Sequence, residues 1–199
     1  MEKIVNFLAI SGKLKFTYRY SEVSKIPKES SAAHSWQLSL MVFLIADELN
    51  LDINMEKALK IAIIHDIAEA LIGDVDMILI KDKKVTKEEK YQLEANAINK
   101  FKNFFPKSRK IKDLWQEYQE NKTREARFVR ALDKIEALTF LAELGYKFYD
   151  RPEFIPMYAD DFVKVFPELI PFLKIVKLRL KEEFKRGNIP WKDKYNYGL

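Results

Sequence analysis

Apolar side chains recur every three or four residues along most of this chain, and this spacing restricts its fold more than any other feature. Such a repeat places the apolar residues on one face of an α-helix, whereas a half-buried strand needs strict alternation. No alternating stretch is long enough to build a sheet. The sequence therefore predicts an all-α fold, with helices over residues 4–14, 36–49, 58–71, 91–105, 128–144 and 170–184.

Polar residues and glycines mark the expected helix ends. Asn54 is placed to cap the third helix, and Gly73 lies where a left-handed C-terminal cap is expected after it. Thr86 and Glu89 have the spacing of a capping box before the fourth helix. Three connecting stretches are expected to be extended, namely residues 16–26, 78–85 and 150–156.

The chain shows no convincing domain boundary. We expect a single domain over residues 1–199, in which a motif-bearing core of about 7–144 is followed by a helical extension of about 157–199. Too little chain follows the loop at 151–156 to form a second core. Packing rather than helix propensity should hold the chain in a compact bundle of about six helices.

The content of cysteine and histidine excludes several kinds of site. Cysteine is absent, which excludes disulfide scaffolds, cysteine zinc fingers, iron–sulfur sites and thiol nucleophiles. Histidine occurs only twice, so any site that needs imidazole must use His34 or His65. The net charge of +5 is a mild excess of mixed charges, and nucleic-acid binding is not expected.

No targeting or membrane segment is expected. The most apolar stretch, 38–46, is far shorter than the roughly 20 residues of a membrane-spanning helix. The sequence therefore favours a cytoplasmic protein without membrane association.

The segment 61–74 carries the densest set of chemically active side chains. His65 and Glu69 are four residues apart, and Asp66 and Glu69 are three apart, so a continuous helix would place them on neighbouring parts of one face. The run before His65 is strongly apolar, and a charged aspartate is rarely buried without a counter-charge or a metal. For His65 and Asp66 taken alone, the competing interpretation is a surface-facing Asp66 beside a hydrogen-bonded core histidine.

Two further helices offer ligand-type side chains from apolar surroundings. His34 lies near the start of the predicted helix 31–50, and Asp133 lies inside the apolar segment 128–138. Two imidazoles and two carboxylates suit a divalent transition metal such as Mn, Fe, Co, Ni or Zn. Such an ion would polarise a phosphoryl group and activate water, with Glu69 placed to handle protons nearby.

Several aromatic residues are expected to pack rather than to bind. Phe101, Phe104 and Phe105 are more typical of core or dimer contacts than of a base-stacking platform. Trp115 and Tyr118 have the spacing of helix packing.

The order His34, His65-Asp66 and Asp133 resembles the H…HD…D pattern of the HD-domain metal-dependent phosphohydrolases. The surrounding residues resemble the compact members of this family, which include the 5'-deoxynucleotidases, from about residue 7 to about residue 144. They read Glu29-Ser-x-Ala-x-His34, His65-Asp-x-Ala-Glu69-x-x-x-Gly-Asp74, Lys87-Glu-Glu-Lys90 and Glu125-Ala-x-Phe-Val-x-x-x-Asp133-Lys-x-Glu136.

The resemblance implies a role for each matching position. Glu69 matches the catalytic acid, and Asp74 matches a second acid near the substrate. The metal ligands of the family fall on His34, His65, Asp66 and Asp133. Relatives with two metals use additional histidines for the second ion. This chain has no histidine besides His34 and His65, so one divalent ion is expected.

The resemblance also implies a substrate site. Arg19 lies fifteen residues before His34, at the position of the arginine that orients the phosphate, and a guanidinium suits phosphate oxygens. Tyr20 and Met77 are expected to contact the substrate together with Asp74. The chain departs from the pattern at Ala33, where an acid is common, so one contact to the site is expected to be missing.

The expected function is that of a metal-dependent phosphomonoesterase. It would hydrolyse (deoxy)nucleoside 5'-monophosphates to nucleoside and phosphate, with Glu69, Asp74 and Arg19 as catalytic residues, and the resemblance implies a homodimer. Two alternatives stay open. One is hydrolysis of another phosphorylated nucleotide, a dNTP or an alarmone. The other is a catalytically silent HD module that binds nucleotide or metal and regulates a partner.

Overall fold

The computed structural model describes residues 1–22, 26–101, 104–105 and 108–199. Within those residues the chain forms ten α-helices, five short 3-10 helices and a single isolated antiparallel bridge between Tyr18 and Ser30. The all-α prediction is confirmed, although the helices are more numerous than the six expected, and several of the additional ones are short. No helix in these ranges combines the length and the apolar character needed to cross a membrane.

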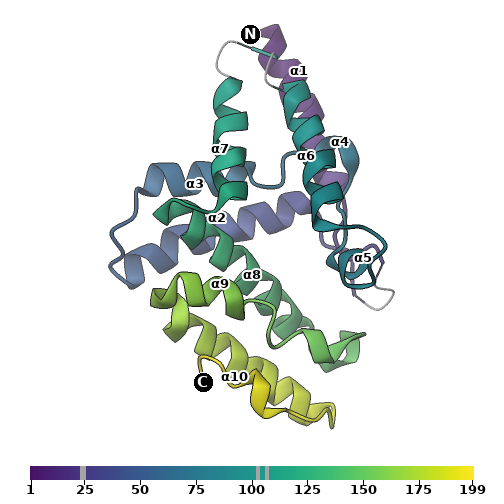
Figure 1. Ribbon diagram of the computed structural model, residues 1–199, viewed down its shortest axis with the longest axis vertical. Coiled ribbons are helices and arrows are strands. Elements are labelled where there is room, and N and C mark those ends of the chain that lie inside the picture. The colour runs from purple at the N-terminus through teal and green to yellow at the C-terminus, as the bar shows by residue number, and fades with distance from the viewer. Residues whose placement is uncertain (23–25, 102–103, 106–107) are drawn as a thin grey trace.

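The helices differ in length from one turn to about six turns. Figure 1 shows α8 descending from the centre of the molecule, with α9 and α10 along its lower half and with α1, α6 and α7 at the opposite end. The bounds are α1 Glu2–Ser11, α2 Ser31–Glu48, α3 Met55–Ile64, α4 Glu69–Ile72, α5 Met77–Lys81, α6 Lys87–Phe101, α7 Arg109–Glu120, α8 Arg124–Leu144, α9 Asp160–Val165 and α10 Ile170–Arg186. The 3-10 helices are η1 Gly12–Phe16, η2 Tyr146–Phe148, η3 Pro152–Phe154, η4 Pro167–Leu169 and η5 Asp193–Tyr195.

Helix α8 is the element on which the rest of the bundle packs. It contacts α2, α3, α7, α9 and α10. Its apolar side chains, such as Phe128, Leu132 and Leu138, are fully buried. A helix enclosed in this way carries its polar residues into the core as well, and Asp133 and Glu136 are only 4% and 2% exposed. Buried carboxylates need partners, so α8 brings two such groups to the centre of the molecule.

The predicted helix 58–71 is interrupted at the motif. Helix α3 ends at Ile64, and α4 begins at Glu69. Between them the N–H groups of Ile67 and Glu69 donate to carbonyls only three residues back, both at 3.0 Å. This tighter winding replaces the regular α-helix. The expectation that His65, Asp66 and Glu69 share one face of a continuous helix is therefore wrong.

The capping residues act largely as predicted. Asn54 Oδ1 accepts the Lys57 N–H at 3.0 Å. Thr86 and Glu89 form the capping box, with Thr86 Oγ1 accepting the Glu89 N–H at 3.1 Å and Glu89 accepting the Thr86 N–H at 2.7 Å. Gly73 ends α4 at φ 78° and ψ 170°, a conformation that favours glycine but lies outside the left-handed helical region.

Two of the stretches expected to be extended contain helical turns. In 78–85 the chain forms most of α5, because Asp76 Oδ1 caps that helix by accepting the Ile78 N–H at 2.9 Å. The stretch 150–156 contains η3. The predicted helix 91–105 ends earlier, at Phe101, and residues 102–103 lie outside the described residues.

The C-terminal helices share the core of α8. On α10, Lys177 is fully buried, and its Nζ lies 2.6 Å from Asp160 of α9 and donates to the Tyr195 carbonyl at 3.1 Å. A buried ammonium needs such partners. Lys177 therefore joins α9, α10 and the C-terminal tail.

Candidate metal centre

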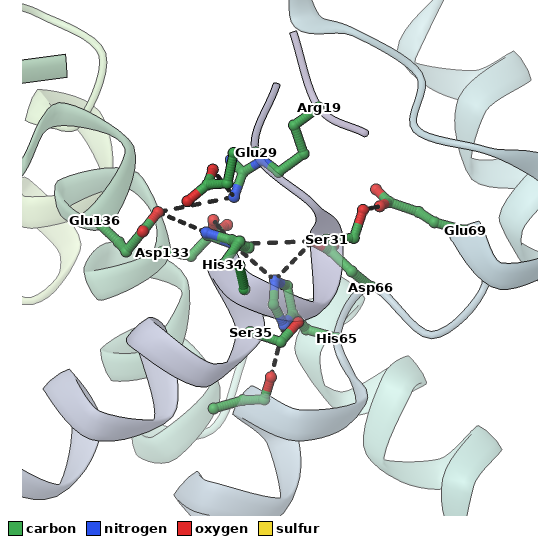
Figure 2. A network of polar contacts seen from close by, with 12 residues as sticks. Arg19, Glu29, Ser31, His34, Ser35, His65, Asp66, Glu69, Asp133 and Glu136 are labelled. Atoms are coloured by element: carbon green, nitrogen blue, oxygen red, sulfur yellow. Dashed lines mark hydrogen bonds and ion pairs between the residues drawn. The ribbon is translucent and has the colours of Figure 1, made fainter. Parts of the chain in front are cut away.

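Four side-chain donor atoms converge at the centre of the bundle (Figure 2). His34 Nε2 of α2 lies 3.3 Å from His65 Nε2 and 3.2 Å from Asp133 Oδ1 of α8. Asp66 Oδ2 lies 3.0 Å from His65 Nε2 and 3.8 Å from His34 Nε2. Metal bonds of 2.0–2.2 Å to nitrogen and oxygen separate neighbouring ligands by roughly 3.0–3.5 Å. The ligand atoms of His34, His65 and Asp133 all lie within 4.8 Å of one another, so these three could share one ion, and Asp66 adjoins both imidazoles.

The outer nitrogens of both imidazoles already have partners. His34 Nδ1 lies 2.5 Å from Glu136 Oε2, and His65 Nδ1 lies 2.8 Å from the Ala62 carbonyl oxygen. Because both partners are acceptors, each Nδ1 carries a proton and donates it. In the neutral ring, each Nε2 is then unprotonated and has a lone pair available for a ligand bond. Two lone pairs and two carboxylates then face one another, and a cation would stabilise this arrangement.

The charges around His34 favour a cation at the same place. Burial and the charge of Arg19 lower the pKa of His34, but the Glu136 carboxylate and hydrogen bonds to Asp133 and Glu136 outweigh them and raise it to about 9. Burial raises the pKa of Asp133, yet Lys134 and His34 hold it well below its ordinary range. The centre therefore attracts a positive charge, either a proton on imidazole or a metal ion.

Asp133 is held from its outer side by two residues. Tyr118 Oη of α7 donates to Asp133 Oδ2 at 2.6 Å, and Lys134 Nζ donates to the same oxygen at 2.7 Å. These contacts leave Oδ1 facing His34. The ring of Tyr118 also meets the His65 ring edge-on, with centroids 5.3 Å apart. Sequence reasoning assigned Tyr118 only to helix packing, and its contact with Asp133 had no signal in the sequence.

Glu69 lies beside the four donors rather than among them. Its Oε2 accepts a hydrogen bond from Ser31 Oγ at 2.6 Å, and its side chain is buried (Figure 2). Burial raises the pKa of Glu69 well above its ordinary range, and the charges of Asp66 and Asp74 add to the effect. These surroundings favour the protonated form of Glu69.

Arg19 reaches the centre from the loop after η1. Its Nη1 lies 3.7 Å from both Glu29 and Glu136, and it has no hydrogen-bond partner within the described part of the chain. Burial raises the pKa of Glu29, as does the charge of Glu136, while Arg19 lowers it, and the result is about 7. Glu136 of α8 also binds His34 Nδ1.

A cavity of about 400 Å³ opens next to the four donors. All the residues predicted to contact substrate line it, namely Arg19, Tyr20, Asp74 and Met77. Tyr20 has a backbone φ of 59°, its ring stacks on Phe140 with centroids 5.7 Å apart, and its buried hydroxyl has no partner among the described residues. A strained backbone and an unpaired polar atom in a cavity wall are features of binding sites.

The chain is similar to known proteins over most of its length. The sequence profile of the HD domain matches residues 11–157. The 5'-deoxynucleotidase HDDC2 of Dictyostelium discoideum is 36% identical over 148 residues, which are 69% of this chain and 75% of that protein. The 5'-deoxynucleotidase hdd1 of Schizosaccharomyces pombe is 34% identical over 155 residues, 73% of this chain and 74% of that one. A conserved hypothetical protein from Pyrococcus furiosus, whose structure is solved, is 31% identical with a TM-score of 0.64, covering 85% of this chain and 98% of that chain.

Proposed function

The chain belongs to the HD-domain family of metal-dependent phosphohydrolases, and we propose that it hydrolyses (deoxy)nucleoside 5'-monophosphates to nucleoside and inorganic phosphate. The similar proteins named as 5'-deoxynucleotidases support this substrate class. The observation that carries the proposal is the position of Arg19. Arg19 lines the cavity that adjoins the four donors, and its buried Nη1 has no hydrogen-bond partner in the described chain.

One divalent transition metal ion is proposed at the centre, with Mn, Co, Fe, Ni or Zn all compatible with the donor set. His34, His65, Asp66 and Asp133 would hold it. When bound, such an ion polarises a phosphoryl oxygen and activates water for attack on phosphorus. Glu136 and the Ala62 carbonyl keep the two Nε2 atoms directed inward, and Tyr118 does the same for one oxygen of Asp133.

The remaining polar residues have complementary roles in the proposal. Arg19 would direct its guanidinium to a phosphate oxygen and stabilise the negative charge that grows there. Glu69 would hold a proton for transfer at the reacting oxygens, with its carboxyl fixed by Ser31. Asp74 would assist it from the same cavity wall, while Tyr20 and Met77 contact the nucleoside.

A panel of nucleotides tests this function. Protein freed of metal by a chelator and supplied with Mn²⁺ or Co²⁺ is expected to release inorganic phosphate from deoxynucleoside 5'-monophosphates. Pyrophosphate or triphosphate release from dNTPs or alarmones would favour the first alternative instead. Tight nucleotide binding without turnover, unaffected by Glu69→Gln, would favour the regulatory module. Absence of metal-dependent release from every monophosphate contradicts the proposal.

A homodimer is also proposed, because α2 presents an apolar stripe to solvent. Trp36, Leu40, Phe43 and Leu44 recur at helical spacing and are all exposed. Light scattering is expected to give twice the chain mass for the wild type and the mass of one chain for Trp36→Lys. A monomeric wild type would contradict this.

A further inference from the structure

The sequence motif around His34 begins with Glu29, a residue to which the proposed function gives no role. The backbone of Glu29 pairs with that of Arg19. The Arg19 N–H donates to the Glu29 carbonyl oxygen at 2.9 Å, next to the bridge between Tyr18 and Ser30. The backbone therefore holds Glu29 beside the residue that is proposed to bind the phosphate.

The side chains of Glu29 and Arg19 also meet, next to the metal centre (Figure 2). Glu29 Oε2 lies 3.7 Å from Arg19 Nη1, and the two side chains are only 8% and 13% exposed. Neither of these two atoms has a hydrogen-bond partner within the described part of the chain. A buried charge is costly unless an opposite charge lies near it. Glu29 and Arg19 therefore depend on each other's charge.

A second carboxylate lies near the same nitrogen. Glu136 Oε2 is also 3.7 Å from Arg19 Nη1. The same oxygen lies 2.5 Å from His34 Nδ1, so Glu136 contacts the imidazole more closely than the guanidinium. Arg19 Nη1 is thus equally distant from two acids, one of which also holds a proposed metal ligand. Without the charge of Glu29, the attraction of Glu136 would be unopposed, and the guanidinium would move toward it.

We propose that Glu29 is a positioning residue for Arg19, an inference that rests on the proposed function for the role of Arg19 toward phosphate. The Glu29 carboxylate balances that of Glu136 and prevents the guanidinium from closing on Glu136. Groups that stabilise growing charge work best when they are held in place before the reaction. Arg19 lines the cavity and Glu29 does not, so Glu29 acts on a ligand there only through Arg19.

A double-mutant cycle of Glu29→Gln and Arg19→Gln tests this role. Glutamine keeps the size of the Glu29 side chain and removes its charge. Steady-state kinetics of the metal-loaded protein give kcat and KM for 2'-deoxyadenosine 5'-monophosphate. Calorimetry gives the Kd of inorganic phosphate, which needs no turnover, and elemental analysis gives the bound metal. Glu22→Gln, at an exposed position between η1 and α2, is the matched control.

Glu29→Gln is expected to lower kcat/KM and to raise the Kd of phosphate by about tenfold each, as for coupled residues of one charge network. In the Arg19→Gln background the same substitution should change neither value by more than about twofold. The metal content should stay at the wild-type level, as should all values for Glu22→Gln. Glu29→Asp, which keeps the charge on a shorter side chain, should lose less than Glu29→Gln.

Equal losses with and without Arg19 would overturn the proposal, as would unchanged values in Glu29→Gln or a fall in its metal content. Tighter phosphate binding by Glu29→Gln would also overturn it, because Glu29 would then compete with phosphate for Arg19. Circular dichroism checks the fold. If Glu29→Gln unfolds, Glu29→Asp takes its place in the cycle, and its smaller loss should likewise disappear without Arg19. If phosphate binding shows the coupling in a protein that hydrolyses nothing, the positioning role stands and the proposed function fails.

Discussion

The two ends of the cavity are held in place by different kinds of contact. At the metal end, His34, His65 and Asp133 are buried, and each has a hydrogen bond on the side away from the centre. At the other end, the segment carrying Phe154 is tied to α5 by Arg151 and Asp82, whose side chains are 38% and 28% exposed. Exposed ion pairs contribute little to stability, whereas buried hydrogen-bond networks fix geometry.

This difference matches the task proposed for the metal end. Groups that stabilise developing charge act best when they are already in position, because the reaction then needs no rearrangement. Substitutions at the metal end should therefore affect turnover strongly, and substitutions of Arg151 or Asp82 should affect substrate affinity modestly.

The largest effect is expected from Asp66→Ala. Losing one of the proposed ligands should lower kcat by about a thousandfold, since metal activation accounts for several kcal/mol of the barrier. The bound metal measured by elemental analysis should fall as well. Asp47→Ala, at an exposed position of α2, serves as the control. Near-normal turnover in Asp66→Ala would remove this residue from the metal end.

Glu69→Gln should separate proton handling from metal binding. The amide keeps the size of the side chain but cannot transfer a proton, so kcat should fall by about a hundredfold or more. Metal content should stay at the wild-type level, because Glu69 lies beside the four donors and not among them. Glu48→Gln, exposed on α2, is the matched control. A loss of metal together with activity would place Glu69 among the ligands instead.

Tyr118→Phe is expected to have an intermediate effect. Removing the hydroxyl deprives Asp133 Oδ2 of one of its two donors, and such outer contacts typically change metal affinity by about 10- to 100-fold. Titration of the chelated protein with Mn²⁺ measures that affinity, and circular dichroism checks the fold. Tyr146→Phe, away from the cavity, is the control. Unchanged metal affinity would show that Tyr118 only packs, as its sequence spacing indicates.

The smallest effect is expected from breaking the Arg151–Asp82 pair. Asp82→Asn should raise KM for nucleotides by less than about threefold, because an exposed ion pair is weak, and the change should shrink further in high salt. Arg151→Gln and the double variant complete a double-mutant cycle, which measures the coupling between the two side chains. A KM increase above tenfold would mean that the end of the cavity at Phe154 is held as firmly as the metal end.

Part of this site could be predicted from sequence, because its signals are local. His34, His65, Asp66 and Asp133 stand out as polar residues in apolar helices, and they come together as expected. The break between α3 and α4 could not be predicted, since the same apolar spacing continues through it. Tyr118 was missed because its contact with Asp133 joins two helices, and sequence spacing does not record which side chains meet across helices.

The aromatic residues Phe154 and Tyr158 of the cavity lining show the same limit more clearly. Phe154 lies in the loop 151–156 and Tyr158 just after it, where the sequence has no motif. Their place beside the cavity depends on how α9 and α10 pack on α8. Packing of this kind depends on contacts between segments far apart in the sequence. Residues that reach the cavity through such packing therefore leave a weaker trace in sequence than residues that bind a metal.

Metal titration of activity tests the central claim most directly. Chelated protein is mixed with increasing Mn²⁺ or Co²⁺, and phosphate release from 2'-deoxyadenosine 5'-monophosphate is measured at each step. We expect no release without metal, a linear rise as metal is added, and a plateau at one ion per chain. Release that is independent of metal, or that requires two ions per chain, would contradict a single ion held by His34, His65, Asp66 and Asp133.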